Sequence, residues 1–362
     1  MQKKLSIQEN NGLSVIDLFC GCGGLSLGFK RQGFNIVSGV DFDDASVTTY
    51  NHNFGVGHKL DLSDDKWVEE VASSTKKRSV DVLIGGPPCQ GYSLTGTRDY
   101  SDSRNKLYNS MFVGAKFFDA KVVLIENVRG MSSLYGGKAK EEVIGLFEGL
   151  GYNVKNRILD SAYFYVPQHR QRLFFVATKP GVSFEWPEYI TTEDNFVTCS
   201  DGIGDLPSMQ NNMLDDEAEY MSEPACDFQA LMRENSDRIF NHQPTRHKDF
   251  VIETIRQVPE GGNHKDLPPG VGESRKFNEA WTRYHSQKPS RTIDTGHRNH
   301  FHYRYDRVPT VRENARLQSF PDDFVFKGSK TQQNKQVGNA VPVLLAQALA
   351  AEIQKGLLNE RP

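Results

Sequence analysis

Residues 80–93 read Val-Asp-Val-Leu-Ile-Gly-Gly-Pro-Pro-Cys-Gln-Gly-Tyr-Ser, and the rest of the chain is organised around them. The apolar run 80–84 predicts a short, buried strand of a parallel sheet. Two glycines and two prolines then end the strand in a stiff turn. Cys89 therefore follows the carboxyl end of a strand, the edge where open α/β sheets bind ligands. A lone cysteine is usually a small buried apolar residue. A rigid turn at this edge instead makes Cys89 a candidate nucleophile.

A strand, a glycine-rich turn and a helix precede this stretch. Residues 13–19 predict the first strand, and glycines follow at positions 21, 23, 24 and 28, with a helix from about 24 to 32. Such glycines let the main chain approach a nucleotide-like ligand. The dinucleotide fingerprint requires a glycine at position 26, where Ser26 stands, so a nicotinamide cofactor is disfavoured. Asp41 ends the strand predicted over 35–40, and an acid there suits a pair of ribose hydroxyls.

Further polar residues end the strands that follow. Asp61, after a short third strand, is a second candidate for a cofactor contact. Glu126 ends a strand predicted over 121–125, beside the strand of Cys89 if consecutive strands are neighbours. Arg170 and Arg172 fall in a strand predicted over 168–177, and arginines rarely enter a buried strand without a partner or ligand. The polar, glycine-containing loop from Cys89 to about residue 104 is typical of an active-site lid.

Composition limits the classes of function. The 362 residues suffice for two domains. No apolar run approaches the length of a membrane span. The five cysteines lack paired spacing, which predicts a reducing cytoplasm. Cys20 and Cys22 have no partner pair for a metal and are expected to pack in the core. A net charge of -3 is not that of a non-specific nucleic-acid binder, so any such contact needs a local basic face.

The alternation of strands and helices stops after residue 181 and does not return before about residue 290. Residues 201–223 carry seven acidic and no basic side chains, whereas residues 283–316 carry eight basic side chains against three acidic ones. Tyrosines and histidines interleave with these bases, which suits phosphate contact with base stacking or, equally, a solvated charged face. A strongly apolar helix predicted over 343–353 is expected to pack back on the first domain.

Taken in order, these motifs resemble those of the DNA (cytosine-5) methyltransferases of prokaryotic restriction-modification type, over nearly the whole chain. The motifs are Asp17-Leu18-Phe19-x-Gly21-x-Gly23-Gly24, Pro87-Pro88-Cys89-Gln90, Glu126-Asn127-Val128, Gln168-x-Arg170-x-Arg172, Arg312-Glu313-x-Ala315-Arg316-Leu317-Gln318 and Gly338-Asn339. The resemblance implies a Rossmann-like S-adenosylmethionine-dependent sheet and a smaller, irregular target-recognition domain. The expected catalytic domain comprises 1–183 and 332–362, and the recognition domain comprises 184–331, with its variable part at about 184–290.

The resemblance also implies roles for individual residues. Cys89 would add to C6 of a flipped-out cytosine. Glu126 would contact N3 and N4 of the ring in a protonated state, which burial favours. Arg170 would bind O2, and Arg172 would either contribute to catalysis or only orient the loop. Cofactor contacts are expected from Asp17, Phe19, Gly21, Gly23, Gly24, Asp41, Phe42, Asp61, Pro87 and Asn339. DNA contacts are expected from Ser93, Arg98, Arg104, Arg283, Arg298 and Arg312.

The implied enzyme methylates C5 of cytosine in a specific double-stranded DNA sequence, as a monomer in a bacterial cytoplasm, with no metal and no membrane contact. It would act in functional pairing with a restriction endonuclease. An RNA cytosine-5 methyltransferase is the main competing interpretation, disfavoured because its Cys-Phe-Thr tripeptide is absent and the insert is long. A catalytically inert DNA-binding module is disfavoured because every expected catalytic residue is present, and a nicotinamide oxidoreductase is disfavoured by Ser26.

Overall fold

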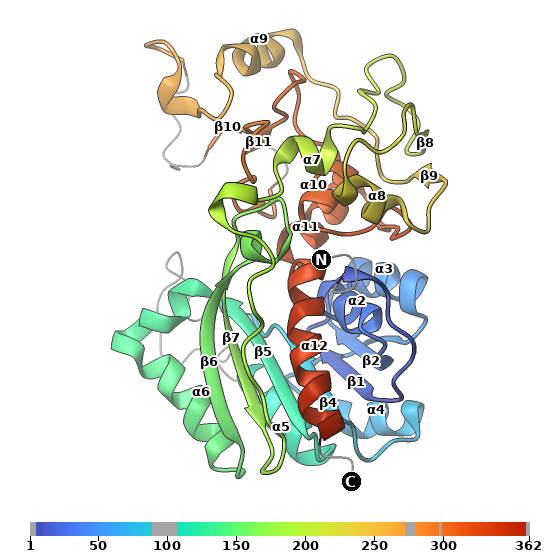
Figure 1. Cartoon of the computed structure of the whole chain (residues 1–362), viewed down its shortest axis with the longest axis vertical. Coiled ribbons are helices and arrows are strands. Elements are labelled where there is room, and N and C mark those ends of the chain that lie inside the picture. Colours follow the sequence, from blue (N-terminus) through green and yellow to red (C-terminus); the bar gives the residue numbers. More distant parts are fainter. Residues whose placement is uncertain (1–4, 89–106, 272–279, 297–298, 360–362) are drawn as a thin grey trace. The chain divides into compact units, whose positions relative to one another are not determined.

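The computed structural model describes residues 5–88, 107–271, 280–296 and 299–359, and these form two compact units (Figure 1). The first unit comprises residues 1–160, 171–188 and 343–362, and the second comprises residues 161–170 and 189–342. These boundaries differ from the expected ones. Residues 161–170 and 332–342 group with the second unit, and residues 184–188 group with the first.

A seven-stranded sheet forms the centre of the first unit, with strand order β3-β2-β1-β4-β5-β7-β6. Only β7 runs antiparallel to its neighbours among the described strands of this sheet, which confirms the predicted α/β class. The strands are β1 (Ser14–Leu18), β2 (Asn35–Asp41), β3 (Gly57–Lys59), β4 (Val82–Gly85), β5 (Val122–Val128), β6 (Asn153–Asp160) and β7 (Gln171–Thr178).

The register of two strand pairs positions the motif residues. β4 and β5 are parallel neighbours, with Gly85 opposite Ile125, so the Cys89 strand and the Glu126 strand do lie side by side. β7 begins at Gln171 and pairs antiparallel with β5, placing Arg172 opposite Val128. Arg172 therefore lies in the sheet as expected, whereas Arg170 lies just before the strand and belongs to the second unit.

Helices cover both faces of the sheet. Side chains of α4 (Trp67–Thr75), α5 (Leu107–Phe117) and α6 (Lys138–Glu148) pack with Ile16 and Leu18 of β1 in one apolar cluster. Alternation along β1 directs Asp17 to the other face, where α2 (Gly24–Arg31) lies. The remaining helix before β3 is α3 (Asp44–Phe54).

The C-terminal helix α12 (Val343–Asn359) packs on the first unit, as predicted, and Figure 1 shows it beside α2. The two helices approach so closely that a Cβ atom on Gly28 would lie 2.4 Å from the Cβ atom of Ala346. Arg31 Nε donates to Gln347 Oε1 at 3.1 Å across the same interface. The helical stretch 330–359 is long and apolar enough to span a membrane, but 67% of its most apolar window is buried, as in a core helix.

The second unit contains only short elements among its described residues, consistent with the predicted irregular domain. Its strands form two separate pairs, β8 with β9 and β10 with β11, of two residues each. The elements are α7 (Cys199–Ile203), β8 (Ala218–Glu219), α8 (Asp227–Arg233), β9 (Arg238–Ile239), α9 (Asp249–Gln257), β10 (Thr282–Arg283), β11 (His300–Phe301), α10 (Val311–Leu317) and α11 (Lys330–Asn339).

Buried ion pairs around α10 supplement the small apolar clusters of this unit. Arg316 is fully buried and pairs with Asp322 at 2.6 Å and with Asp205 at 2.8 Å. Arg307 donates to both oxygens of the buried Glu313, at 2.6 and 2.7 Å. Asp205, one of the seven acids of residues 201–223, is thus a structural residue rather than a solvated one.

Candidate active site

The loop between β1 and α2 is shaped by its glycines. Gly21 and Gly23 have φ angles of 53° and 103°, a region that favours glycine. A Cβ atom on Gly23 would lie 2.4 Å from the ring of Phe54, so a larger residue would displace that ring. Phe19 also has a positive φ, 56°, a strained conformation that concentrates at ligand sites. The main chain is therefore open to close approach at the carboxyl edge of the sheet.

Asp41 braces this glycine loop from the end of β2. Its Oδ2 accepts a hydrogen bond from Gly21 N at 2.8 Å, and its Oδ1 accepts one from Asp43 N at 2.8 Å. Burial raises the pKa of Asp41. The neighbouring Phe42 is 70% exposed, a large apolar surface left without cover at a predicted cofactor edge.

Asp61 lies beyond the end of β3 and is exposed. Its Oδ1 accepts hydrogen bonds from the main-chain N and the hydroxyl of Ser63, at 2.9 and 2.7 Å, and these bonds lower the pKa of Asp61. The side chain is thus held as an ionised acceptor with its second oxygen available. This chemistry suits an amino group of a ligand, as the sequence predicts.

Beneath the glycine loop, Asp17 is buried and takes part in a short hydrogen-bond chain. The hydroxyl of Ser26 donates to Asp17 Oδ2 at 2.7 Å, so it accepts from the hydroxyl of Tyr50, also at 2.7 Å. The other oxygen, Asp17 Oδ1, has no hydrogen-bond partner within the described chain. Burial, assisted by the charge of Asp41, raises the pKa of Asp17 to about 8. Ser26, which departs from the dinucleotide fingerprint, therefore serves to bind the acid of β1.

The structure describes the nucleophile turn only as far as Pro88. Cys89, Ser93, Arg98 and Arg104, and the predicted lid to which they belong, lie outside the described residues. The turn begins under tight packing, since a Cβ atom on Gly85 would lie 2.7 Å from Leu18 O. Pro87 is buried, and its carbonyl accepts a hydrogen bond from Asn127 Nδ2 at 3.0 Å.

Glu126 and Arg172 form an ion pair beside this turn. Arg172 Nε lies 3.0 Å from Glu126 Oε1, and the two side chains are largely buried. The other carboxylate oxygen faces Gly86, because a Cβ atom built there would lie 3.2 Å from Glu126 Oε2. A carboxyl group and a guanidinium thus stand together at the carboxyl ends of β4 and β5, next to the chain that leads to Cys89.

Arg170 occupies a different environment, within the second unit. It is 2% exposed, and its guanidinium donates to the main-chain carbonyls of Ile293 at 3.2 Å, Gly338 at 2.9 Å and Asn339 at 3.5 Å. These bonds connect α11 to the chain before β7. Asn339 itself is the exposed last residue of α11.

Of the arginines expected to contact DNA, Arg312 is buried, contrary to that expectation, whereas Arg283 is only partly buried. Arg312 is 0% exposed and donates to the carbonyls of Phe240, Pro321 and Phe324. Arg283 donates to the carbonyls of His302 and Val258 and pairs with Asp306. Hydrogen-bond geometry explains both cases, because a buried guanidinium can satisfy several carbonyls at once. Arg298, also expected to contact DNA, lies outside the described residues.

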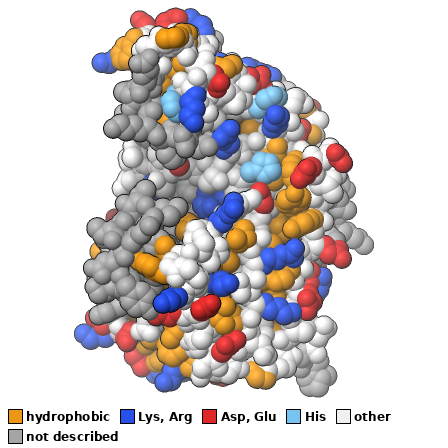
Figure 2. Space-filling model, turned by 90° about the vertical axis from the view of Figure 1, so that its left-hand side faces the viewer, with side chains coloured by type: hydrophobic (Ala, Val, Ile, Leu, Met, Phe, Trp, Pro, Cys, Tyr) orange, Lys and Arg blue, Asp and Glu red, His pale blue; other side chains and the backbone are white. Residues whose placement is uncertain are grey.

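The positive charge counted in residues 283–316 of the sequence is therefore not all exposed on the protein surface. Arg307, Arg312 and Arg316 are buried and Arg283 is partly buried, and all four have acidic or carbonyl partners. Figure 2 shows both basic and acidic side chains on the face that it draws. Sequence charge counts cannot separate solvated bases from bases that neutralise buried acids.

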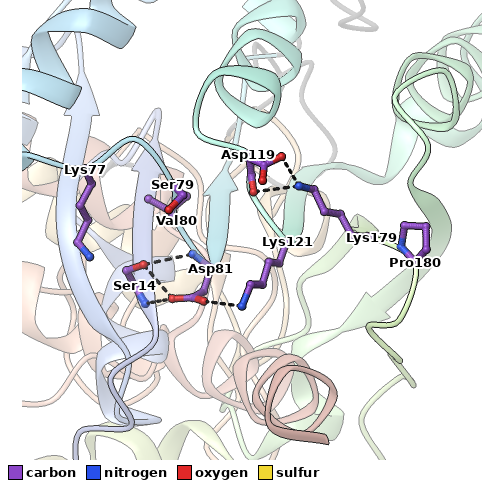
Figure 3. Close-up of a pocket in the computed structure, with 9 residues that line it drawn as sticks. All are labelled: Ser14, Lys77, Ser79, Val80, Asp81, Asp119, Lys121, Lys179 and Pro180. Atoms are coloured by element: carbon purple, nitrogen blue, oxygen red, sulfur yellow. Dashed lines mark hydrogen bonds and ion pairs between the residues drawn. The ribbon is translucent and has the colours of Figure 1, made fainter. Parts of the chain in front are cut away.

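A cavity of about 420 Å³ lies at the opposite, amino-terminal edge of the sheet (Figure 3). Asp81 there accepts hydrogen bonds from Ser14 N and Oγ at 2.8 and 2.9 Å and pairs with Lys121 at 3.3 Å. Lys179 pairs with Asp119 across the same cavity. Because these charges satisfy one another and the motif residues lie at the other edge, the cavity is not assigned to the reaction.

Four residues of this region do not belong to the site predicted from the sequence: Ser26, Tyr50, Tyr108 and Asn127. Asn127 stands in one of the family motifs, so its position next to Glu126 is a usable signal. Ser26 departs from the dinucleotide pattern, but its sequence neighbours do not indicate the acid that it binds. Tyr50 and Tyr108 carry no sequence signal, since their contacts depend on the packing of α3 and α5.

Comparison with known proteins gives consistent matches over the chain. The family model for C-5 cytosine-specific DNA methylase matches residues 13–355. The type II methyltransferase M1.HphI of Haemophilus parahaemolyticus is 40% identical over 360 residues, covering 96% of this chain and 88% of that protein. The type II methyltransferase M.DdeI of Desulfomicrobium norvegicum is 32% identical over 367 residues, covering 94% and 88%.

The fold has a similar match among solved structures. A putative DNA modification methyltransferase encoded within an E. coli prophage superposes with a TM-score of 0.77 at 24% identity. The alignment covers 96% of this chain and 100% of that chain. At this level of identity the likeness concerns the fold.

Proposed function

Since the chain belongs to the C-5 cytosine-specific DNA methylase family, we propose how its residues divide the work of methylating cytosine. C5 of cytosine is a poor nucleophile, whereas addition of a thiolate at C6 turns C5 into an enamine-type carbon. The chain must therefore supply a thiol, a group that stabilises charge on the ring, and a site for the methyl donor.

The carboxyl edge of β1, β2 and β3 fits S-adenosylmethionine as that donor. The glycine loop can meet the methionine end, one acceptor of Asp41 can meet the ribose hydroxyls, and the exposed Phe42 ring can stack on adenine. The available oxygen of Asp61 can accept from the adenine amino group. When bound there, the cofactor supplies an electrophilic methyl sulfonium. Asp17, Gly21, Gly23 and Gly24 shape the loop from below.

Cys89 is the proposed nucleophile, because it follows the turn whose carbonyl at Pro87 is anchored to β5. Its thiolate adds to C6 of the target cytosine and forms a carbon–sulfur bond, and the electron pair of the C5–C6 double bond becomes available at C5. C5 would then be able to take the methyl group that the cofactor would supply, leaving that cofactor as a neutral thioether. Loss of the C5 proton to a base and expulsion of the Cys89 thiolate restore the ring.

Glu126 and Arg172 are proposed to bind the ring during the addition. Glu126 contacts N3 and N4 of the ring. Because Arg172 already contacts Glu126, and O2 is next to N3 in the ring, Arg172 is placed to offset charge at O2. This assignment revises the expectation for Arg170, whose guanidinium serves main-chain carbonyls in the second unit.

The substrate and setting complete the proposal. A cytosine inside a duplex cannot reach such a site, so it must leave the base stack. We assign the substrate as a specific double-stranded DNA sequence, the setting as a bacterial cytoplasm, the active form as a monomer, and the cellular function as protection of DNA from a partner restriction endonuclease. The type II relatives support this pairing.

One observation carries the proposal: the Glu126–Arg172 pair lies directly beside the turn that leads to Cys89. Transfer of a radiolabelled methyl group from S-adenosylmethionine should occur on DNA and not on RNA or without substrate. Transfer to RNA alone would instead favour an RNA cytosine-5 methyltransferase. Bisulfite sequencing of DNA from an expressing host would then identify the methylated site.

A further inference from the structure

The side-chain amide of Asn127 is buried and uses all of its hydrogen-bonding groups. Asn127 lies next to last in β5 and is 3% exposed. Its Nδ2 donates to Pro87 O at 3.0 Å and to the hydroxyl of Tyr108, and its Oδ1 accepts from Val128 N at 2.8 Å. A buried amide with both donors committed fixes its partners relative to the strand.

The Tyr108 hydroxyl is fixed in turn. Tyr108 is the second residue of α5, is buried, and donates through its hydroxyl to Met131 Sδ at 3.0 Å. Its ring packs in the apolar cluster beneath the sheet with Met111 and Met131. The hydroxyl therefore accepts from Asn127 and donates to Met131.

These two bonds fall on either side of the segment that carries the nucleophile. Pro87 precedes Cys89 by two residues, and Tyr108 is the second described residue after segment 89–106. One amide of β5 thus holds the chain both where it enters that segment and where it leaves it.

We infer that Asn127 and Tyr108 are positioning residues for the Cys89 thiolate. They set the carbonyl of Pro87, and through the stiff Pro87-Pro88 turn the start of the Cys89 peptide, relative to Glu126, the preceding residue of β5. Covalent addition requires the sulfur at about 3–3.5 Å from C6, and a displacement of about 1 Å costs about 100-fold in rate. The inference rests on the proposed function, since it assumes that Cys89 adds to the base.

The Tyr108→Phe variant is the sharpest test, because it removes one oxygen and keeps the ring in the cluster. Tyr152→Phe is the matched control: Tyr152 is buried in the same cluster, and its hydroxyl donates to Ala120 O at 2.5 Å, away from the turn. Tyr108→Phe loses two buried hydrogen bonds and Tyr152→Phe loses one, each worth about 1 kcal/mol of unfolding free energy. Asn127→Ala is the third variant, and it removes the hydrogen bonds to both Pro87 and Tyr108.

The measurement is the single-turnover rate of covalent adduct formation with a 5-fluorocytosine duplex, together with the Tm and the Kd for S-adenosylmethionine. We expect Tyr108→Phe to slow the adduct about 10-fold and Asn127→Ala about 100-fold. The Kd should change less than about twofold, and Tyr152→Phe should lower only the Tm. If Tyr108→Phe keeps the parent's adduct rate, as Tyr152→Phe is expected to do, the positioning function is refuted.

The same experiment distinguishes this inference from the proposed function. A parent enzyme that forms no adduct, or an adduct that persists in Cys89→Ala, refutes the covalent function itself. A parent that forms the adduct through Cys89, with a rate that Tyr108→Phe leaves unchanged, refutes only the positioning. If Asn127→Ala does not fold, the Tyr108→Phe result alone decides.

Discussion

Arg170 and Arg172 are separated by one residue, but their guanidinium groups have different partners. The backbone between them passes from one unit to the other, and β7 begins at Gln171. Arg172 gains a carboxylate partner at the end of β5, whereas Arg170 binds the carbonyls that end α11. The chemistry of each guanidinium thus follows from where the strand starts, not from its place in the motif.

Substitution of the two arginines separates their functions. Arg172→Ala should lower the adduct rate by about 100- to 1000-fold, as loss of a donor to a developing negative charge does, with cofactor affinity unchanged. Arg170→Ala should instead lower the free energy of unfolding by about 1 kcal/mol for each hydrogen bond lost, because it leaves buried carbonyls without donors. Single-turnover kinetics and urea unfolding measure the two effects. If the Arg170→Ala protein is as stable as the parent but forms the adduct far more slowly, the contact with O2 of cytosine belongs to Arg170.

Asp17 gives a pH dependence whose sign can be worked out. Burial raises its pKa from 3.8 to about 8 in the folded protein. Between these values the carboxyl is neutral when folded and ionised when unfolded, so the free energy of unfolding falls as the pH rises. Below about 4 and above about 8 the group has the same charge in both states and adds no slope.

The Asp17→Asn variant removes this titration and keeps the size of the side chain. Without cofactor, the parent should lose stability relative to the variant by up to about 1.4 kcal/mol per pH unit between about pH 4 and about pH 8. Urea unfolding at several pH values measures the difference. Parallel curves for the two proteins over this interval would show that Asp17 is ionised in the fold.

Among the helices, α12 at the end of the chain packs closely on α2 of the first unit. Gly28→Ala would place a Cβ atom 2.4 Å from Ala346 Cβ and 2.6 Å from Gln347 N. Overpacking of this kind costs about 1–3 kcal/mol. The control is Gly145→Ala in α6, where no atom lies within 4 Å and alanine is the better helix former.

Urea unfolding should therefore show the two substitutions to have opposite signs. Gly28→Ala should destabilise the protein, and Gly145→Ala should stabilise it slightly. Equal effects at the two positions would mean that the two helices can separate without cost, contrary to the packing described above.

Strands β1, β2, β4 and β5 were predictable because each contains a short apolar run that ends at or close to a glycine or an acid. The observed β1, β2, β4 and β5 fall within a few residues of the predicted ranges. The antiparallel insertion of β7 between β5 and β6 was not predictable, because strand direction is decided by tertiary pairing. Helix α11 gives no sequence signal because its residues, Lys-Thr-Gln-Gln-Asn-Lys-Gln-Val-Gly-Asn, include almost no apolar side chains to set a helical period.

The site was predictable to the extent that it follows strand ends. Asp41 ends β2, Glu126 lies among the last three residues of β5, and Asp61 lies two residues after β3. The burial of the arginines expected to contact DNA was not predictable, because whether an arginine is solvated or neutralises a buried acid depends on residues distant in sequence. Arg316, for example, pairs with Asp205, 111 positions away.

At the scale of the whole molecule, the two units separate chemistry from sequence recognition in the proposed function. Residues 189–290 belong to the second unit, whereas Glu126, Arg172 and Asp41 belong to the first. Grafting 189–290 from a homologue with another target should change which cytosine is methylated and leave the Kd for S-adenosylmethionine nearly unchanged. Residues 184–188 stay native, because Lys155 Nζ donates to Phe184 O at 2.6 Å within the first unit.

Bisulfite sequencing after expression of the chimera measures its target, and cofactor titration verifies that the first unit is intact. A chimera that binds cofactor and methylates the original site would place specificity outside 189–290. The loop after Cys89 would then be the next segment to exchange.

Cys89 is proposed to bond to the target base, and intact mass spectrometry detects such a bond. The purified protein is incubated with S-adenosylmethionine and a duplex carrying 5-fluorocytosine at the methylated position, where fluorine blocks loss of the C5 substituent and retains the enzyme. We predict a species with the summed mass of protein, DNA strand and one methyl group, with the bond mapped to Cys89 and absent in Cys89→Ala. A methylated product released without any covalent species, or an adduct mapped to another residue, would contradict the account.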